Sequence, residues 1–471
     1  MYVVFSYGLH IYNQNLFYGQ NSGGINGNPL GLYRTKYIRN AIKDHNLTIN
    51  YDKDLNDDLN LKVIVGGNSN SIFFKRDGLE SARQIVFGVL KHWNFTDVSS
   101  TNSFNGINFQ REETNNTMGV FGDVTLGYKD FLYVNGAVRH DWTSTLEREN
   151  NSITYPSASV SFIATNAFDA LKSDGLGLNY MKVRFGYGSS AGFPNVYSTR
   201  NTLALNGRAF VDDAGQVISS NTTSDFLGNP ALKPETVSEL ELGVDSRLLD
   251  NRLGLNVSIF KRETKDLITN KDLDPSTGFT FTTLNGGDLE VKGIEADLNL
   301  DVFKGIDGGF GWNSSVNFYA DEPTVTRLPD GIDQIIIGNF FTDDAKNAAI
   351  EGQPFGVFIG DAVRRDADGN KIITASNGFY DLDPDDTIIG DPNPDWTAGW
   401  SNTFRYKGFS LYALVNYRHG GDIYSKTAVT LLSRGVIDFP FDRLGAFILP
   451  GVNEDGSPNT TLIGASDIAF E

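Results

Sequence analysis

The clearest feature of the chain is an alternation of apolar and polar residues along many short segments. In Ser238–Leu248, leucine and valine occupy one parity, and the turn Asp250–Asn251 leads into a second segment with the same alternation. Because successive side chains of a strand point to opposite faces, this period of two predicts a sheet with one apolar and one polar face. The charged parity of the first segment holds Glu239, Glu241, Asp245 and Arg247.

The same hairpin pattern recurs along the chain and predicts about twelve strands in six hairpins. Three further copies are Val120–Tyr128 with Phe131–His140, Ile294–Leu300 with Phe310–Phe318, and Trp396–Tyr406 with Phe409–Tyr417. Two others are Leu47–Tyr51 with Leu59–Val65, and Ala158–Phe162 with Val183–Tyr187. We therefore expect an all-β protein built from about 12–14 antiparallel strands.

Strand length and loop length together favour a barrel that spans a membrane. Several alternating segments reach about 9–11 residues, which crosses a bilayer at a tilt, whereas strands of soluble proteins average about 5–6 residues. The turns within most hairpins are short, and the connections between hairpins are long and polar, the longest running from Tyr319 to Asp395. This asymmetry is typical of outer-membrane β-barrels. We expect aromatic girdles near the strand ends at Trp312, Trp396, Trp400, Tyr406 and Tyr417.

The same alternation also fits the core of a soluble β-sandwich. In that alternative, the chain is a soluble or surface-attached β-rich module for binding or adhesion. The two hypotheses differ in what covers the apolar parity, which is lipid in a membrane barrel and protein in a sandwich.

Composition narrows the class of protein further. The 50 glycines and the 12% of aromatic residues suit strands and turns. No run of about 18 apolar residues occurs, which excludes a transmembrane helix. The net charge of -19 disfavours nucleic acid as a partner, because phosphates need lysine and arginine. The absence of cysteine removes disulfides and thiolate metal sites.

Several strings match a known family in order and spacing. The most specific is Asn229–Thr236 (NPALKPET), followed by Glu241–Asp245 (ELGVD). The others are Tyr155–Ser159, Lys182–Gly188, Gly390–Trp396, Asn402–Phe404, Tyr406–Phe409, Gly420–Tyr424, Leu449–Val452 and Asp455–Asn459. Together they resemble segments of the SusC/RagA-type TonB-linked outer-membrane proteins.

This resemblance implies a fold and a function for the whole protein. The fold is a transmembrane antiparallel barrel of about 22 strands with a plug in its lumen. The function is TonB-dependent transport of oligosaccharides or peptides across the cell outer membrane, together with a SusD-like surface lipoprotein and the TonB complex. We expect no cofactor and no enzymatic activity, and we expect contact with outer-membrane lipid.

The chain departs from the family pattern at its two ends. Met1–Phe5 has no basic segment followed by an apolar segment and a cleavage site, which an exported protein needs. About twelve strands are also fewer than the family barrel contains. We therefore expect residues 1–471 to be a partial barrel domain truncated at both ends, with the plug and the signal peptide absent.

One string looks like catalytic chemistry. Gly188–Gly192 has the form G-x-S-x-G, which would make Ser190 the nucleophile of a hydrolase. A nucleophile elbow requires a helix directly after the serine, but Pro194 follows instead of an amphipathic segment. We interpret the string as a glycine-rich exit from a barrel strand.

Two acidic segments are candidates for binding a hard cation. Asp366 and Asp368 begin a string that resembles a calcium loop, although Gly378 occupies the position of the usual bidentate glutamate. Asp383 and Asp385 lie in a second acidic segment. The alternative is that all four are solvated acids of turns.

The polar parity of the strands predicts a hydrated lumen. Its expected lining is Glu239, Glu241, Asp245, Asn256, Asp297, Asn299, Asn313 and Asn317. Any water-filled barrel has such a lining, so the ligand-contacting residues stay unassigned.

Overall fold

The computed structural model describes residues 1–24, 28–99, 109–172, 177–211, 214–305, 308–329, 331–339, 345–434, 436 and 445–464. These residues fold as two compact units. The first consists of Met1–Ser246 and Thr264–Gly286, and the second of Arg247–Glu263 and Gly287–Glu471. Of the helices described, α1 (Ala164–Ala167) and α2 (Lys426–Ser433) included, none is long and apolar enough to cross a membrane.

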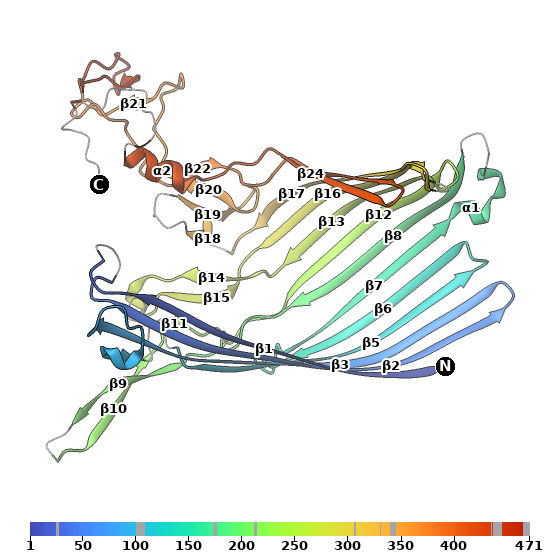
Figure 1. Ribbon diagram of the computed structural model, residues 1–471, viewed down its shortest axis with the longest axis horizontal. Helices are drawn as coiled ribbons and strands as arrows, with labels where there is room; N and C mark the ends of the chain where they lie inside the picture. Colours follow the sequence, from blue (N-terminus) through green and yellow to red (C-terminus); the bar gives the residue numbers. More distant parts are fainter. Residues whose placement is uncertain are drawn as a thin grey trace. The chain divides into compact units, whose positions relative to one another are not determined.

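The first unit is dominated by long strands that lie side by side, from β1 in blue to β8 in green (Figure 1). Their order is β1 (Tyr2–Gln20), β2 (Leu32–Asn56), β3 (Leu59–Gln84), β5 (Arg111–Tyr128), β6 (Leu132–Thr143), β7 (Ser152–Ile163), β8 (Leu178–Gly192) and β12 (Glu235–Leu248). Neighbours from β1 to β8 are antiparallel, and β4 (Phe95–Ser99) pairs with the end of β3.

Smaller sheets complete the first unit. β9 (Leu203–Val211) and β10 (Val217–Thr223) form a hairpin. β15 (Phe281–Asn285) lies between β11 (Phe226–Leu227) and β14 (Ile268–Asp272). The short 3-10 helices are η1 (His92–Asn94), η2 (Asp169–Leu171) and η3 (Pro275–Thr277).

The second unit contains five long strands and two smaller sheets. The long strands run in the order β13 (Leu253–Lys265), β16 (Asp288–Lys304), β17 (Gly311–Arg327), β23 (Trp396–Tyr406) and β24 (Phe409–His419). A four-stranded sheet contains β18 (Gln334–Asn339), β19 (Ala345–Ile350), β20 (Val357–Gly360) and β22 (Thr387–Gly390). β21 (Ile372–Ile373) and β25 (Val452–Asn453) pair in parallel.

Five of the six predicted hairpins are confirmed in their registers. Tyr128 pairs with Leu132 across a turn in which Lys129 and Asp130 have φ of 48° and 54°. Two successive positive φ values define a type I′ turn, whose twist matches that of antiparallel strands. Counting β4 together with the long strands of both units, the described residues contain fourteen such strands. This number agrees with the 12–14 strands expected from the sequence.

The apolar parity of the strands is exposed rather than buried. Leu240 and Leu242 of β12 each expose 44% of their surface, and Ile259 of β13 exposes 52%. Glu241 lies between the two leucines and points to the opposite face, where it is partly buried. A soluble sandwich would bury the leucines and expose the acid, so the exposed face fits lipid and the sandwich alternative is wrong.

Three strands at the start of the chain are much longer than the sequence pattern indicated. β2 and β3 contain 25 and 26 residues, and β1, which was not predicted, pairs with β2 along all of its 19 residues. Spanning a bilayer takes only about 9–11 residues. Lipid on one face is what imposes the alternation on which the prediction relied, and the additional length of these strands is not subject to that constraint.

The longest predicted loop contains a folded β structure. β17 continues to Arg327, and β18, β19, β20 and β22 occupy much of the region up to Gly390. Ala348, Val357 and Ile359 form a buried cluster under this small sheet. The expectation of a polar loop from Tyr319 to Asp395 is therefore wrong, because its short apolar strands are separated by many turn residues that dominate the composition.

Aromatic side chains gather near the two ends of β23, where they contact residues of β17. Near the turn, Trp312 stacks on Phe404 with ring centroids 5.6 Å apart. At the opposite end of β23, the ring centroid of Trp396 lies 5.8 Å from that of Phe318. Eight residues separate Trp396 from Phe404, about 26 Å along the strand, which fits two interfacial girdles. The prediction is wrong for Trp400, which lies in the middle of β23 and donates a 2.9 Å hydrogen bond to Ser314.

An ion pair ties two loops of the first unit together. The Arg200 guanidinium donates to Glu147 through Nε at 2.8 Å and Nη2 at 2.7 Å, and the Thr199 hydroxyl donates at 2.8 Å. Hydrogen bonds from Arg200, and then from Thr199, lower the pKa of Glu147 to about 2. Glu147 lies between β6 and β7, so the contact fixes that loop to the segment that follows β8.

We predict that arginine in place of Leu242 destabilises the folded protein by about 2–4 kcal/mol, because it puts a cation on the lipid-facing parity near the middle of β12. The measurement is the free energy of unfolding in lipid vesicles. Ser159→Arg, on the polar parity of β7, is the control and should cost much less. Equal losses for the two variants would contradict the assigned faces.

We predict that the Glu147 contact loses its stabilising effect in acid. The pKa of Glu147 in the folded protein is about 2, below its ordinary value of 4.5. The contribution is therefore complete above about pH 4.5 and is lost as the pH falls towards 2. Limited proteolysis of the loop between β6 and β7 from pH 7 to pH 2 measures this, with Glu147→Gln as the control. Protection that falls with acid equally in both proteins would refute the assignment.

Candidate functional site on the polar sheet face

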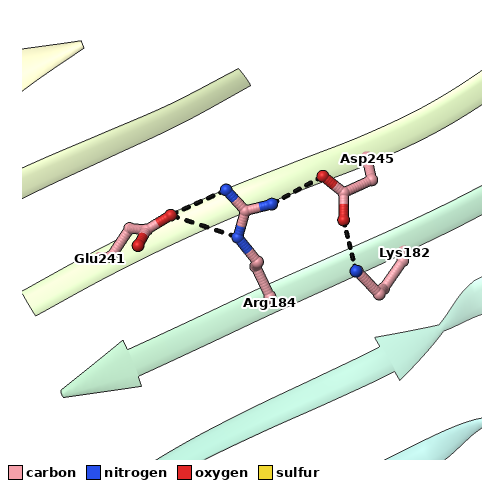
Figure 2. Close-up of polar contacts among 4 residues, drawn as sticks. All are labelled: Lys182, Arg184, Glu241 and Asp245. Carbon is pink, nitrogen blue, oxygen red and sulfur yellow. Dashed lines mark hydrogen bonds and ion pairs between the residues drawn. The ribbon is translucent and has the colours of Figure 1, made fainter. Parts of the chain in front are cut away.

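Four charged residues alternate across β8 and β12 on the polar face of the first unit (Figure 2). Arg184 bonds to Asp245 at 2.6 Å through Nη1 and to Glu241 at 2.8 Å through Nη2. Lys182 Nζ lies 2.5 Å from the other carboxylate oxygen of Asp245. Two cations and two acids take part, so the net charge of the network is zero. Each side chain is only partly exposed to solvent, and the ion pairs replace hydration that is partly lost.

A glycine makes room for this network. A Cβ atom on Gly243 would lie 2.6 Å from Cζ of Arg184, closer than any non-bonded contact. The guanidinium therefore lies directly over Gly243, between the carboxylates of Glu241 and Asp245. This explains the spacing of the E-L-G-V-D string, in which two acids flank a glycine on one face of the strand.

A second polar cluster lies on the same face between β6 and β7. Arg139 bonds to Asp141 at 2.7 Å and donates to the side chain of Asn68 at 2.6 Å. The Tyr155 hydroxyl donates to Asp141. A recess of about 380 Å³ lies beside these groups, and Asp123 is among its lining residues. The first unit thus presents a wall of paired charges with a shallow depression beside Arg139.

The second unit carries amides on its polar face. The side chain of Asn313 donates to Asn299 and to Asp301, both at 2.9 Å. Asn299 donates in turn to Ser315 at 3.0 Å. Asp297, Asn317 and Asn256 lie on the same parity of their strands, as do Glu239, Glu241 and Asp245 in the first unit. That these residues line a lumen stays a prediction.

Ser190 does not occupy a nucleophile elbow. It lies within β8, which continues in extended conformation to Gly192, so the required turn and helix are lacking at this position. Its neighbour Ser189 donates a 2.6 Å hydrogen bond to the carbonyl of Pro156 on β7. The string is part of a barrel strand, as predicted.

The acidic candidates for cation binding lie in turns. The Asp366 carboxylate accepts hydrogen bonds from the backbone N–H groups of Asp368 and Asn370 at 3.0 and 2.8 Å. Asp383 accepts from the backbone of Asp385 at 3.4 Å. Across the described ranges, no group of three or more histidines and acids is arranged to hold a metal ion. A metal role for these four acids stays a prediction.

The sequence reasoning missed the Arg139 cluster. A signal was present, because Arg139 and Asp141 share one face of β6 at a spacing of two. Their partners Asn68 and Tyr155 lie on β3 and β7, and no pattern within one segment identifies a partner on another strand. Gly243 also went unrecognised as the residue that makes space for Arg184.

The NPALKPET string joins several segments of the first unit. Asn229 donates to the carbonyl of Thr283 at 3.0 Å, and the Asn285 side chain pairs with both backbone groups of Lys233 at 2.9 Å. Glu235 accepts a hydrogen bond from the backbone of Ile268. Leu232 within the string is fully buried. The string therefore has a structural role in anchoring the loop that precedes β12.

The strings near the C-terminal end of the second unit bond to one another. Asp422 accepts a 2.8 Å hydrogen bond from the backbone of Asp391 and donates from its own backbone to the Asp391 carbonyl at 2.6 Å. Asn393 donates to the carbonyl of Phe355 at 3.0 Å. The segments 390–396 and 420–424, distant in sequence, form one junction beside β23 and β24.

Comparison with known proteins agrees with this architecture. Residues 2–448 match the family described as TonB dependent receptor-like, beta-barrel. The chain belongs to this family. Proteins of the family are outer-membrane transporters and not enzymes, so the hydrolase hypothesis for Ser190 is wrong.

Two relatives of known name have sequences similar to this chain. It is 28% identical over 358 residues to TonB-dependent receptor P3 of Formosa agariphila, covering 72% of this chain and 35% of the relative. It is 24% identical over 425 residues to TonB-dependent receptor SusC of Bacteroides thetaiotaomicron, covering 85% and 39%. The chain thus spans well under half the length of these relatives.

A solved structure supports the fold. The RagAB peptide transporter matches with a TM-score of 0.70 at 18% identity, covering 88% of this chain and 45% of that chain. At this identity the likeness concerns the fold alone. The expected SusC-like barrel is therefore confirmed as the family and the fold of this chain.

We predict that Gly243→Ala destabilises the protein by about 1–2 kcal/mol, because the added methyl group displaces Arg184 from its two carboxylates. The measurement is urea unfolding in lipid vesicles. Gly186→Ala on the same face of β8 is the matched control, since its Cβ would meet only Ser159 at 3.9 Å. An equal effect of the two substitutions would show that the space above Gly243 is unimportant.

Proposed function

We propose that this chain forms part of the barrel wall of an outer-membrane, TonB-dependent transporter. In this role residues 1–471 supply strands with an exposed apolar face towards lipid and a polar face towards the transported molecule. The observation that carries the proposal is the division of the two faces: Leu240 and Leu242 are exposed, while Arg184 and Asp245 pair on the other side. Membership of the TonB-dependent receptor family supports the same role.

We further propose that the transporter imports oligosaccharides or peptides together with a SusD-like surface lipoprotein. The relative named SusC and the similarity in fold to the RagAB peptide transporter support this class of cargo and partner. The long strands β2 and β3 add support, because they exceed the length that crosses a bilayer by roughly 15 residues and offer surface for a partner outside the membrane.

The proposal predicts energy-dependent uptake in the native bacterium. Cells with the gene should take up labelled oligosaccharides or peptides, and deletion of the gene or of TonB should abolish that uptake. Uptake of a monosaccharide that passes through porins is the control and should not change. A tagged protein should also co-purify with a lipoprotein from the membrane fraction.

Two results would contradict the proposal. One is recovery of the natural, full-length protein in the soluble fraction. The other is uptake of every tested oligosaccharide and peptide at the wild-type rate after the gene is deleted.

A further inference from the structure

A recess opens on the polar face of the second unit, where four strands present residues in one row. Asp297 of β16 pairs in register with Asn317 of β17, which pairs with Gly399 of β23, which pairs with Asn416 of β24. The recess above this row has a volume of about 450 Å³. That volume falls within the range of about 300–1,000 Å³ typical of ligand sites.

Gly399 forms the floor of the recess. A Cβ atom there would lie 2.3 Å from the amide oxygen of Asn317 and 3.2 Å from that of Asn416. The backbones of the two asparagines lie about 10 Å apart, because β23 runs between their strands. Their side chains nevertheless converge over Gly399, and this arrangement requires a residue without a side chain.

The polar side chains of this row differ in their contacts from those of the first unit. Among the residues that the structure describes, the side chains of Asp297, Asn317 and Asn416 make no hydrogen bond or ion pair. The contrast is with Glu241 and Asp245 in the first unit, which are both paired with cations. The recess therefore offers a carboxylate and two amides to a molecule from outside the sheet.

The recess lies towards the long-loop end of the strands. Gly399 is the fourth residue of β23, and the turn at Lys407 follows eight residues later. Glu295 and Arg418 border the recess in the next row, and the Arg418 guanidinium is held by the carbonyl of Pro392. Long loops mark the outer side of such barrels, so a molecule arriving from outside would reach this row early.

We propose that the recess binds a neutral sugar residue of an oligosaccharide; this inference rests on the proposed transport function and narrows its cargo. A sugar hydroxyl both donates and accepts, so adjacent hydroxyls can pair with a carboxylate and with both groups of an amide. A lysine or arginine side chain could donate to the carboxylate and to the amide oxygens, but it has no acceptor to offer and would leave the amide N–H groups without partners. The two converging asparagines therefore favour hydroxyls over lysine or arginine.

The test is calorimetric titration of the natural full-length protein, purified in a detergent without a sugar headgroup. The probes are neutral hexasaccharides of glucose, mannose, galactose and xylose, with trilysine as the cationic comparison. Wild-type protein should bind at least one hexasaccharide. Asn416→Ala and Asp297→Asn should each weaken that binding about fivefold or more.

Thr403→Val is the matched control, because Thr403 lies on the same face of β23 about 13 Å from Gly399. It should bind the sugar as the wild type does. Equal far-UV circular dichroism of all variants establishes that each is folded.

Three outcomes would overturn the inference: no hexasaccharide binds the wild type, the recess variants bind sugar as tightly as Thr403→Val, or only trilysine binds and depends on Asp297. Each is distinguishable from failure of the proposed function. If the sugar titrations fail while TonB-dependent uptake of peptides persists in cells, the transport proposal stands and only the sugar site is lost.

Discussion

The constraint on which the structure depends is that a strand in a bilayer must pair all of its backbone groups and turn only apolar side chains to lipid. Inter-strand pairing satisfies the first condition, and strict alternation satisfies the second. A slip of one residue in β12 would move Glu241 and Asp245 into lipid and the leucines into the polar wall. Register, face and sequence are therefore determined together in the part of each strand that crosses the membrane.

A second constraint concerns the charged side chains of the polar face, which need partners where they are only partly exposed to water. In the first unit, Arg184 lies between two acids over Gly243, and Arg139 pairs with Asp141. Such paired charges stiffen the wall and offer little to a ligand, because their bonding capacity is used. The row at Gly399 has the opposite character, since a glycine there brings unpaired amides together. The two arrangements separate structural from ligand-binding parts of the wall.

The sequence predicted the membrane-crossing hairpins well, because the bilayer imposes the period of two on each of them. Prediction failed where that constraint ends. β1 and the outer halves of β2 and β3 carry mixed residues on both faces, and the small sheet around Ile359 lies within turn-rich sequence. From the alternation of the sequence, Glu241 and Asp297 were both predicted to lie on the polar face of their strands. Only the pairing of the strands in the structure shows that Glu241 is bonded to Arg184, whereas Asp297 has no arginine partner among the described residues.

The central claim is that β12 faces lipid on one parity and water on the other. The chain has no cysteine, so single cysteines from Thr236 to Leu248 can each carry a spin label without background. In lipid vesicles, accessibility to oxygen should peak at Leu240, Leu242 and Val244, and accessibility to a water-soluble nickel chelate should peak at the residues between them. Two profiles that rise and fall together, or that show no period of two, would contradict the account.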